Sequence, residues 1–273
     1  MPWLAACSPT GILAALTRFD GETRLGISYG SHARQKLDVY RAQGATSASP
    51  TVLFFYGGSW NRGERVDYAF VGKALAARGI TTIIADYRLY PEVRYPDFLS
   101  DCALAGAWTL KEVAKLGGDA KRVFVMGHSA GAYNAAMLAL DSRWLRLHGA
   151  DPSQWAGWIG LAGPYEFLPI TNVDAQPVFF HPNYPPMTQP IELASAAAPP
   201  TLLLSARSDE LVNPTRNSVA LAEKLKRLRV EVEHSSFDRV SHQTLIAALA
   251  SPLSWLAPVA QSVERFVKTP RSR

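Results

Sequence analysis

Cysteine is scarce in this chain: of its 273 residues, only Cys7 and Cys102 are cysteines. Two thiols this far apart form neither a zinc-ligand pattern nor a disulfide framework. Cys102 stands at helical spacing from Phe98, Ala105 and Thr109, so we interpret it as a small core residue rather than a reactive thiol. The sequence therefore predicts no metal site, and nothing in it indicates a cofactor.

Long apolar runs, internal repeats and low-complexity tracts are also missing. Residues 123–140 carry no formal charge over 18 positions, but Gly-His-Ser and Tyr-Asn lie at the centre of this stretch. Polar residues at the centre of an apolar stretch argue against a transmembrane helix. We therefore predict a buried strand followed by a helix.

The charge balance is modest, with 28 Lys and Arg against 23 Asp and Glu, a net charge of +5. The basic residues are scattered apart from the tail at 265–273, and no nucleic-acid motif accompanies them. We predict a solvated surface and no nucleic-acid partner. With 48% hydrophobic residues, the chain can bury one large core. We expect a single α/β domain over residues 25–273, preceded by an amino-terminal segment at 1–24.

Apolar runs and alternating patterns predict eight strands with helices between them. Such an order predicts a mostly parallel sheet covered by helices on both faces. The predicted strands are at 25–30, 36–42, 51–57, 81–88, 123–126, 157–163, 201–207 and 230–237. The predicted helices are at 66–78, 97–116, 132–140, 142–148, 215–228 and 244–250.

The pentapeptide Gly127-His128-Ser129-Ala130-Gly131 fits G-x-S-x-G, the sharp turn between a strand and a helix that presents a nucleophilic serine. Glycines two residues to either side leave room where side chains would strike the neighbouring strand and helix. Ser129 is therefore the predicted nucleophile. The N–H of Ala130, in the first turn of the helix, is one predicted oxyanion donor.

A second glycine pair, Gly57-Gly58, directly follows the apolar strand predicted at 51–57. Paired glycines let a backbone approach a ligand closely with its N–H groups free. We expect Gly57 and Gly58 to supply the rest of the oxyanion hole.

A serine nucleophile needs a base and an acid that orients the base, both on loops at the carboxyl ends of strands. Asp209 follows the seventh predicted strand by two residues, and His242 follows the eighth by five. Glu210 and Asp238 are rival acids, but Asp209 is nearer its strand end. The other histidines lie inside a strand or the elbow, or precede the acid: His32, His128, His148, His181 and His234.

Residues 164–200 hold 9 of the 19 prolines, too many for a long helix. We predict an irregular arm over the active site, with aromatic rings that line a closed pocket suited to acyl groups of roughly two to six carbons. The alternative is that these rings only pack the arm onto the body. The rings predicted to line the pocket are Trp60, Tyr165, Phe167, Phe179 and Phe180.

Several segments together resemble a known family: YGGSW, DYRLYPE with the later Asp101 and Trp108, GHSAG, SDELV and the final Ser-His. From about Gly30 to Leu253 the chain resembles bacterial esterases of the α/β-hydrolase superfamily, near the hormone-sensitive-lipase and kynurenine-formamidase groups. The resemblance implies an α/β-hydrolase fold and a carboxylic-ester hydrolase that uses Ser129, Asp209 and His242.

The sequence departs from this family at two positions. Tyr56 replaces the histidine that usually precedes the glycine pair, and Ser59 stands where lipase-like members carry a third glycine. Because the oxyanion donors are backbone groups, we expect the hole to survive both changes. The subfamily, and with it the substrate, stays open between a small-molecule ester and an arylformamide such as N-formylkynurenine. A non-catalytic binding module on the same scaffold is the remaining alternative.

The amino terminus has two interpretations. Leu4-Ala5-Ala6-Cys7 matches the pattern after which a bacterial signal peptidase leaves a lipid-modified cysteine, which would place the protein in the cell envelope through a lipid anchor. Only three residues precede it, so the pattern would be the remnant of a longer signal. The alternative is an ordinary thiol in a helix of a cytoplasmic protein, since residues 11–16 follow Cys7 at helical spacing.

Overall fold

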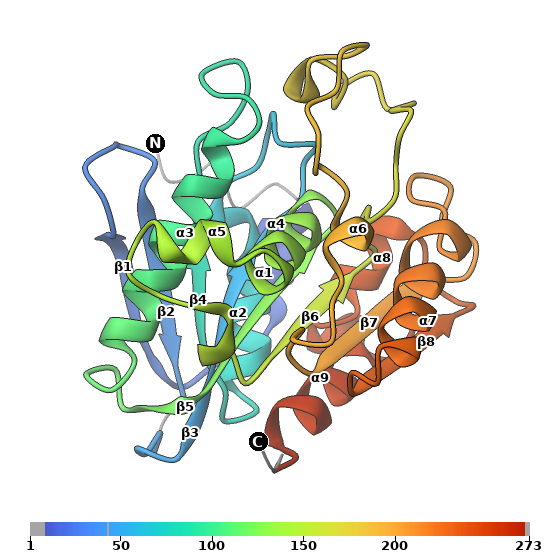
Figure 1. The fold of residues 1–273 in the computed structure, drawn as a ribbon. Coiled ribbons are helices and arrows are strands. Elements are labelled where there is room, and N and C mark those ends of the chain that lie inside the picture. Colours follow the sequence, from blue (N-terminus) through green and yellow to red (C-terminus); the bar gives the residue numbers. More distant parts are fainter. Residues whose placement is uncertain (1–8, 43, 271–273) are drawn as a thin grey trace.

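The computed structural model describes residues 9–42 and 44–270, which form an eight-stranded sheet with helices on both faces (Figure 1). The strand order is β1-β2-β4-β3-β5-β6-β7-β8. The β1–β2 and β2–β4 pairs are antiparallel, and β4, β3 and β5 to β8 run parallel. The strands are β1 Glu22–Ser28, β2 Lys36–Arg41, β3 Ser49–Phe55, β4 Thr81–Ala85, β5 Gly118–His128, β6 Gly157–Leu161, β7 Thr201–Ala206 and β8 Val232–Phe237.

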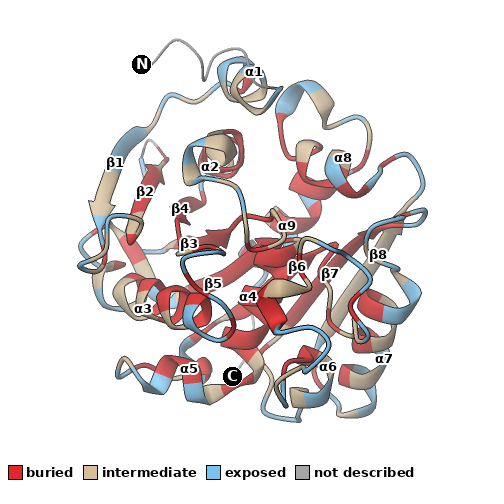
Figure 2. Ribbon diagram, turned by 90° about the horizontal axis from the view of Figure 1, so that it is seen from above, coloured by how far each residue is buried: buried red, intermediate tan, exposed pale blue. Residues whose placement is uncertain are grey.

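Two groups of helices cover the sheet (Figure 2). One face carries α1 Pro9–Leu16, α2 Ala69–Ala76, α8 His242–Ala247 and α9 Val259–Lys268. The other carries α3 Asp97–Glu112, α4 Ala130–Leu140, α5 Ser142–Arg146, α6 Pro190–Leu193 and α7 Ala220–Arg227. Short 3₁₀ segments lie at Arg65–Tyr68, Pro152–Gln154, Pro177–Phe179 and Ser251–Leu253, and a π-helical turn at Thr215–Val219 leads into α7.

The eight strands lie where the apolar pattern predicts them. The predicted helix at 66–78 begins as a 3₁₀ turn and becomes α-helical at Ala69. Helix α9 was not predicted, although its valines and Phe266 recur at helical spacing and are buried. Strand β1 begins at Glu22, so the predicted boundary after residue 24 falls within a strand, and α1 packs against α2.

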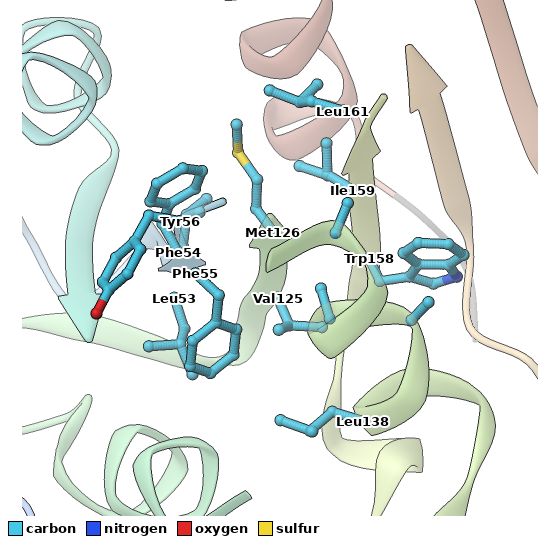
Figure 3. Close-up of a cluster of buried hydrophobic side chains, with 14 of the residues drawn as sticks. Leu53, Phe54, Phe55, Tyr56, Val125, Met126, Leu138, Trp158, Ile159 and Leu161 are labelled. Carbon is cyan, nitrogen blue, oxygen red and sulfur yellow. The ribbon is translucent and has the colours of Figure 1, made fainter. Parts of the chain in front are cut away.

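The core is centred on the parallel strands. Residues 51–55 of β3 and 123–127 of β5 are buried throughout, as expected for strands covered on both faces. Figure 3 shows Phe55, Val125 and Trp158 among the apolar side chains from neighbouring strands in this layer. Cys102 lies in α3 and is fully buried, as predicted for a core residue. Cys7 lies outside the described residues.

The parallel strands all end at one edge of the sheet. The strand order reverses between β3 and β5, because β4 lies on one side of β3 and β5 lies on the other. Open α/β sheets bind ligands outside the carboxyl ends of their strands at such a switch point. The loop after β3, the turn after β5 and the loops after β6, β7 and β8 therefore meet in one place. The predicted site residues lie on these five connections. The glycine pair follows β3, Ser129 follows β5, the arm follows β6, Asp209 follows β7 and His242 follows β8.

The proline-rich arm is irregular, as predicted: between residues 164 and 200 the only helical segments are Pro177–Phe179 and Pro190–Leu193. It rises above the carboxyl edge of the sheet (Figure 1). Two contacts fasten its outer part to the loop after β3: Asn172 Nδ2 donates to Ser59 Oγ at 3.0 Å, and Arg62 pairs with Asp174 at 2.7 Å.

Within the described ranges, no helix has both the length and the apolar character needed to cross a bilayer. Among the same residues, no three or more His, Cys, Asp or Glu side chains are grouped so as to hold a metal ion.

Candidate active site

Ser129 occupies the tight turn between β5 and α4. Its backbone has φ 55° and ψ −123°, a strained conformation for a residue with a side chain. The Ser129 N–H donates to the carbonyl oxygen of Leu161 in β6, at 2.9 Å, which holds the turn against the sheet. Helix α4 begins at the next residue, Ala130, so the serine stands at the amino-terminal end of an 11-residue helix.

The glycines of the elbow are required by close backbone contacts. A Cβ atom on Gly127 would overlap the carbonyl group of Gly131, and one on Gly131 would overlap the carbonyl oxygens of Phe55 and Tyr56. Helix α4 and the end of β3 thus approach the turn too closely for any larger residue at either position. This crowding fixes where Ser129 stands above the sheet.

Three side chains from three separate loops meet at the carboxyl edge. Ser129 Oγ lies 2.8 Å from His242 Nε2, and His242 Nδ1 lies 2.7 Å from Asp209 Oδ2. With Nδ1–H donating to the carboxylate, Nε2 is free to accept the serine proton. His242 and Asp209 are both buried, so water competes little for these hydrogen bonds.

Asp209 is held by the loop that follows β7. Its Oδ1 accepts the backbone N–H groups of Leu211 and Val212, each at 2.9 Å, which leaves Oδ2 for His242. Burial alone would raise the pKa of this carboxyl group, but the hydrogen bond and charge of His242, together with the two backbone donors, lower it below its ordinary value. Asp209 is therefore a carboxylate whenever it orients the imidazole.

The rival residues lie elsewhere. Glu210 is exposed, and Asp238 pairs with Arg207 at the surface. His32 pairs with Glu92. His181 contacts Tyr184 in the arm, and His234 faces two serines within the sheet. His148 lies near α5, beside a separate surface groove.

The loop after β3 approaches Ser129 directly. A Cβ atom on Gly57 would lie 2.8 Å from the Cβ of Ser129. Ser59, the next residue of this loop, lines the cavity beside Ser129 and Ala130. Gly57 and Gly58 therefore stay the predicted oxyanion donors of this loop.

A small cavity of ≈ 80 Å³ opens beside the serine. It is far smaller than pockets for drug-sized ligands, which hold roughly 300–1,000 Å³. Trp60 and Phe167 lie on its wall, as predicted, and the Trp60 indole is fixed because its Nε1–H donates to Asn134 Oδ1 at 2.9 Å. The full lining is Ser59, Trp60, Ser129, Ala130, Pro164, Phe167, Ile170, Thr171, Asn172, Ala175, Leu211 and Val212.

Residues 37–225, more than half of the chain, match the BD-FAE family. The chain belongs to the BD-FAE family.

Three curated relatives of this BD-FAE family member are enzymes by name. The probable isoprenylcysteine alpha-carbonyl methylesterase ICMEL1 of Arabidopsis thaliana is 26% identical over 249 residues, covering 83% of this chain and 52% of the relative. Esterase LipC of Mycobacterium tuberculosis is 30% identical over 224 residues, covering 74% and 55%. Kynurenine formamidase of Salmo salar is 26% identical over 151 residues, covering 55% and 49%. The chain spans about half the length of these relatives.

Among solved structures, a bacterial heroin esterase superposes on the BD-FAE family member with a TM-score of 0.77 at 22% identity, covering 95% of this chain and 89% of that one. At this identity the likeness concerns the fold. With the sheet order described above, it establishes the α/β-hydrolase fold.

Three of the five predicted pocket rings in this BD-FAE family member do not line the cavity. Tyr165 is fully buried against Trp158, because the chain turns back into the body after β6. Phe179 is buried behind Trp60 in edge-to-face contact with its indole, at 4.9 Å between ring centroids. Phe180, in a left-handed conformation, turns outward and stacks on Arg94. For these three rings, the alternative of packing the arm onto the body holds.

The residues that support the glycine loop could not be recognised from the sequence. The Tyr56 hydroxyl donates to Asp86 Oδ1 at 2.8 Å and accepts from Arg34 Nη2 at 2.8 Å. Arg65 Nη1 pairs with Asp86 Oδ2 at 2.5 Å. This network lies at the start of the glycine loop, at the position where the resembling family carries histidine. Tyr56 was visible as a departure from the family pattern, but its partners Asp86 and Arg34 lie 30 and 22 residues away in the sequence, just outside β4 and β2.

Proposed function

We propose that this protein is a serine carboxylesterase that hydrolyses short-chain esters of small molecules through an acyl-enzyme. The observation that carries the proposal is the unbroken relay from Asp209 through His242 to Ser129, with hydrogen bonds of 2.7 and 2.8 Å. Such a relay raises the nucleophilicity of the serine and gives the proton a defined acceptor.

In the proposed reaction, Ser129 Oγ attacks the ester carbonyl carbon while its proton passes to His242 Nε2. The developing oxyanion is stabilised by the N–H of Ala130, at the positive end of α4, and by the N–H groups of Gly57 and Gly58. The imidazolium then protonates the leaving alcohol, and a water activated by the same imidazole releases the acid. Asp209 stays ionised throughout and stabilises the imidazolium.

The dimensions of the cavity support a small acyl group. Its volume is ≈ 80 Å³, and Trp60, Phe167 and Ile170 give it apolar walls. A chain longer than about six carbons would have to displace the Trp60 indole, which Asn134 holds. We expect a butyrate ester to be turned over faster than the matching palmitate. Faster turnover of the palmitate would contradict the proposed pocket.

The names of the relatives agree with ester chemistry: one is a methylesterase and another an esterase. A second candidate, hydrolysis of an arylformamide, is favoured by the similarity to a kynurenine formamidase. The same relay would serve both reactions, since each passes through a tetrahedral intermediate. Turnover of p-nitrophenyl acetate compared with a formanilide separates the two.

The deciding experiment is Ser129→Ala. It removes the atom that forms the acyl-enzyme, so we expect ester hydrolysis to fall by about 10⁶ or to the limit of detection. The exposed Ser251 is the matched control, and Ser251→Ala is expected to keep full activity. If Ser129→Ala kept a substantial share of the activity, the proposal would be wrong. A wild-type protein that binds esters without turnover would indicate a binding module.

A further inference from the structure

We propose that His128 is a positioning residue: it holds the peptide of His242 and thereby sets the reach of that imidazole toward Ser129. The inference deepens, and rests on, the function proposed for this site. His128 is the first x of the G-x-S-x-G motif, directly before the nucleophile. Its own ring does not serve as the base, because its Nε2 lies 3.0 Å from the backbone oxygen of His242.

That contact defines the hydrogen bond. A carbonyl oxygen only accepts, so the proton is on His128 Nε2, and Nδ1 is unprotonated. The ring is buried, and burial, with the nearby His242, lowers its pKa to about 3, which keeps the imidazole neutral. Among the described residues, Nδ1 has no hydrogen-bond partner, so the contact with the His242 carbonyl is the polar anchor of this ring. The two imidazole centroids are 5.0 Å apart.

The segment that carries His242 needs such an anchor. His242 is the first residue of α8, a helix of six residues, and it follows an exposed loop at 238–241 in which only Val240 is buried. A helix this short has little stability of its own. The Ser241 side chain caps it by accepting the N–H of Thr244, but that contact orders only the helix itself. It does not tie the helix to the serine.

His128 links α8 to the strand that carries the nucleophile, in addition to the hydrogen bond between His242 and Ser129 themselves. It is the last residue of β5, a central strand, and pairs with Leu161 of β6 in the parallel register. Ser129 is the next residue in the chain. One rigid side chain therefore connects the strand that carries the nucleophile to the peptide that carries the base. Because the ring cannot lengthen, it limits how far the base can move away from Ser129.

The glycine loop leaves room for this ring. A Cβ atom on Gly57 would lie 3.3 Å from His128 Nδ1 and 3.0 Å from the His128 carbonyl oxygen. The ring is thus enclosed between the end of β3 and the start of α8. Enclosure of this kind fixes the ring orientation and, with it, the direction of the Nε2–H donor.

The test uses two amide replacements of equal polarity. In His128→Gln the side-chain amide reaches about as far as Nε2, and in His128→Asn it reaches only about as far as Nδ1. We expect His128→Gln to retain the hydrogen bond and His128→Asn to lose it. Neither substitution changes the cavity lining or the relay itself. Thermal unfolding of both variants at pH 7 shows whether each is folded.

The first readout is the rate at which Ser129 reacts with a fluorophosphonate probe, which needs no knowledge of the natural substrate. Ser129→Ala is the blank. A displacement of the base by about 1 Å can cost up to about 100-fold in rate, so we expect His128→Asn to react about 10- to 100-fold slower than wild type and His128→Gln within about threefold. Ester hydrolysis should show the same order in kcat with KM unchanged. Equal probe rates for the Asn and Gln variants would overturn the positioning role.

The second readout is the proton NMR signal of the Nδ1–H shared by His242 and Asp209, which requires no reaction. We expect this downfield signal in wild type and in His128→Gln, and its broadening or loss in His128→Asn. If wild type did not react with the probe but the signal followed this order, the proposed function would fail while the positioning role stood. An identical signal in all three proteins would count against the positioning role.

Discussion

Replacing His128 tests the acid stability of the protein as well as its activity. Burial lowers the pKa of this imidazole from 6.5 to about 3. In the unfolded chain the group regains its ordinary value, so between these two pKa values the unfolded state binds a proton that the folded state does not. Stability therefore falls as the pH drops through 6.5 and continues to fall toward pH 3.

The size of this loss follows from the two pKa values. Each pH unit well below 6.5 costs about 1.4 kcal/mol, so the fall from pH 7 to pH 5 costs wild type about 2 kcal/mol through this residue alone. Other groups that titrate in this range are common to wild type and variants and cancel in the comparison. Glutamine and asparagine do not titrate, so both variants should escape this loss.

The assay is urea unfolding of wild type, His128→Gln and His128→Asn at pH 7 and at pH 5. Between the two pH values, we expect each variant to lose about 2 kcal/mol less than wild type. Both variants should show this smaller loss of stability although their probe rates differ. The comparison therefore separates the effect of ring protonation on stability from the effect of the ring's hydrogen bond on reactivity. A parallel loss in all three proteins would show that the imidazole is not buried in its neutral form.

Three further predictions follow from the site and the elbow. Asp209→Asn should lower kcat by about 10⁴, because it mis-orients His242, whereas the exposed Glu210→Gln should change kcat by less than about twofold. The reverse order would move the acid to Glu210. Gly131→Ala should lower the free energy of unfolding by about 1–3 kcal/mol or more in urea titrations, since its Cβ would overlap the carbonyl of Phe55; an unchanged midpoint would refute this packing. Trp60→Ala should raise the octanoate-to-acetate ratio of kcat/KM by about tenfold or more, because it removes a wall of the acyl cavity, and a constant ratio would show that another residue limits the chain length.

Much of this fold is determined by short segments of the sequence. A strand buried on both faces must be continuously apolar, so β3, β5 and β7 were predictable from short runs alone. The elbow was also predictable, because its glycines are required by close backbone contacts that arise wherever a strand turns sharply into a helix. The positions of Asp209 and His242 followed from a topological rule: parallel strands bring their carboxyl ends to one edge.

Only the tertiary structure decided the direction of individual side chains in irregular segments. The arm carries its rings without a repeating period, so the sequence could not show that Phe167 faces the cavity while Tyr165 turns into the core and Phe180 turns outward. The same holds for His128, whose partner is a carbonyl group 114 residues away. Local periodicity encodes which residues are buried, whereas the identity of a distant partner depends on how the loops meet after the sheet has formed.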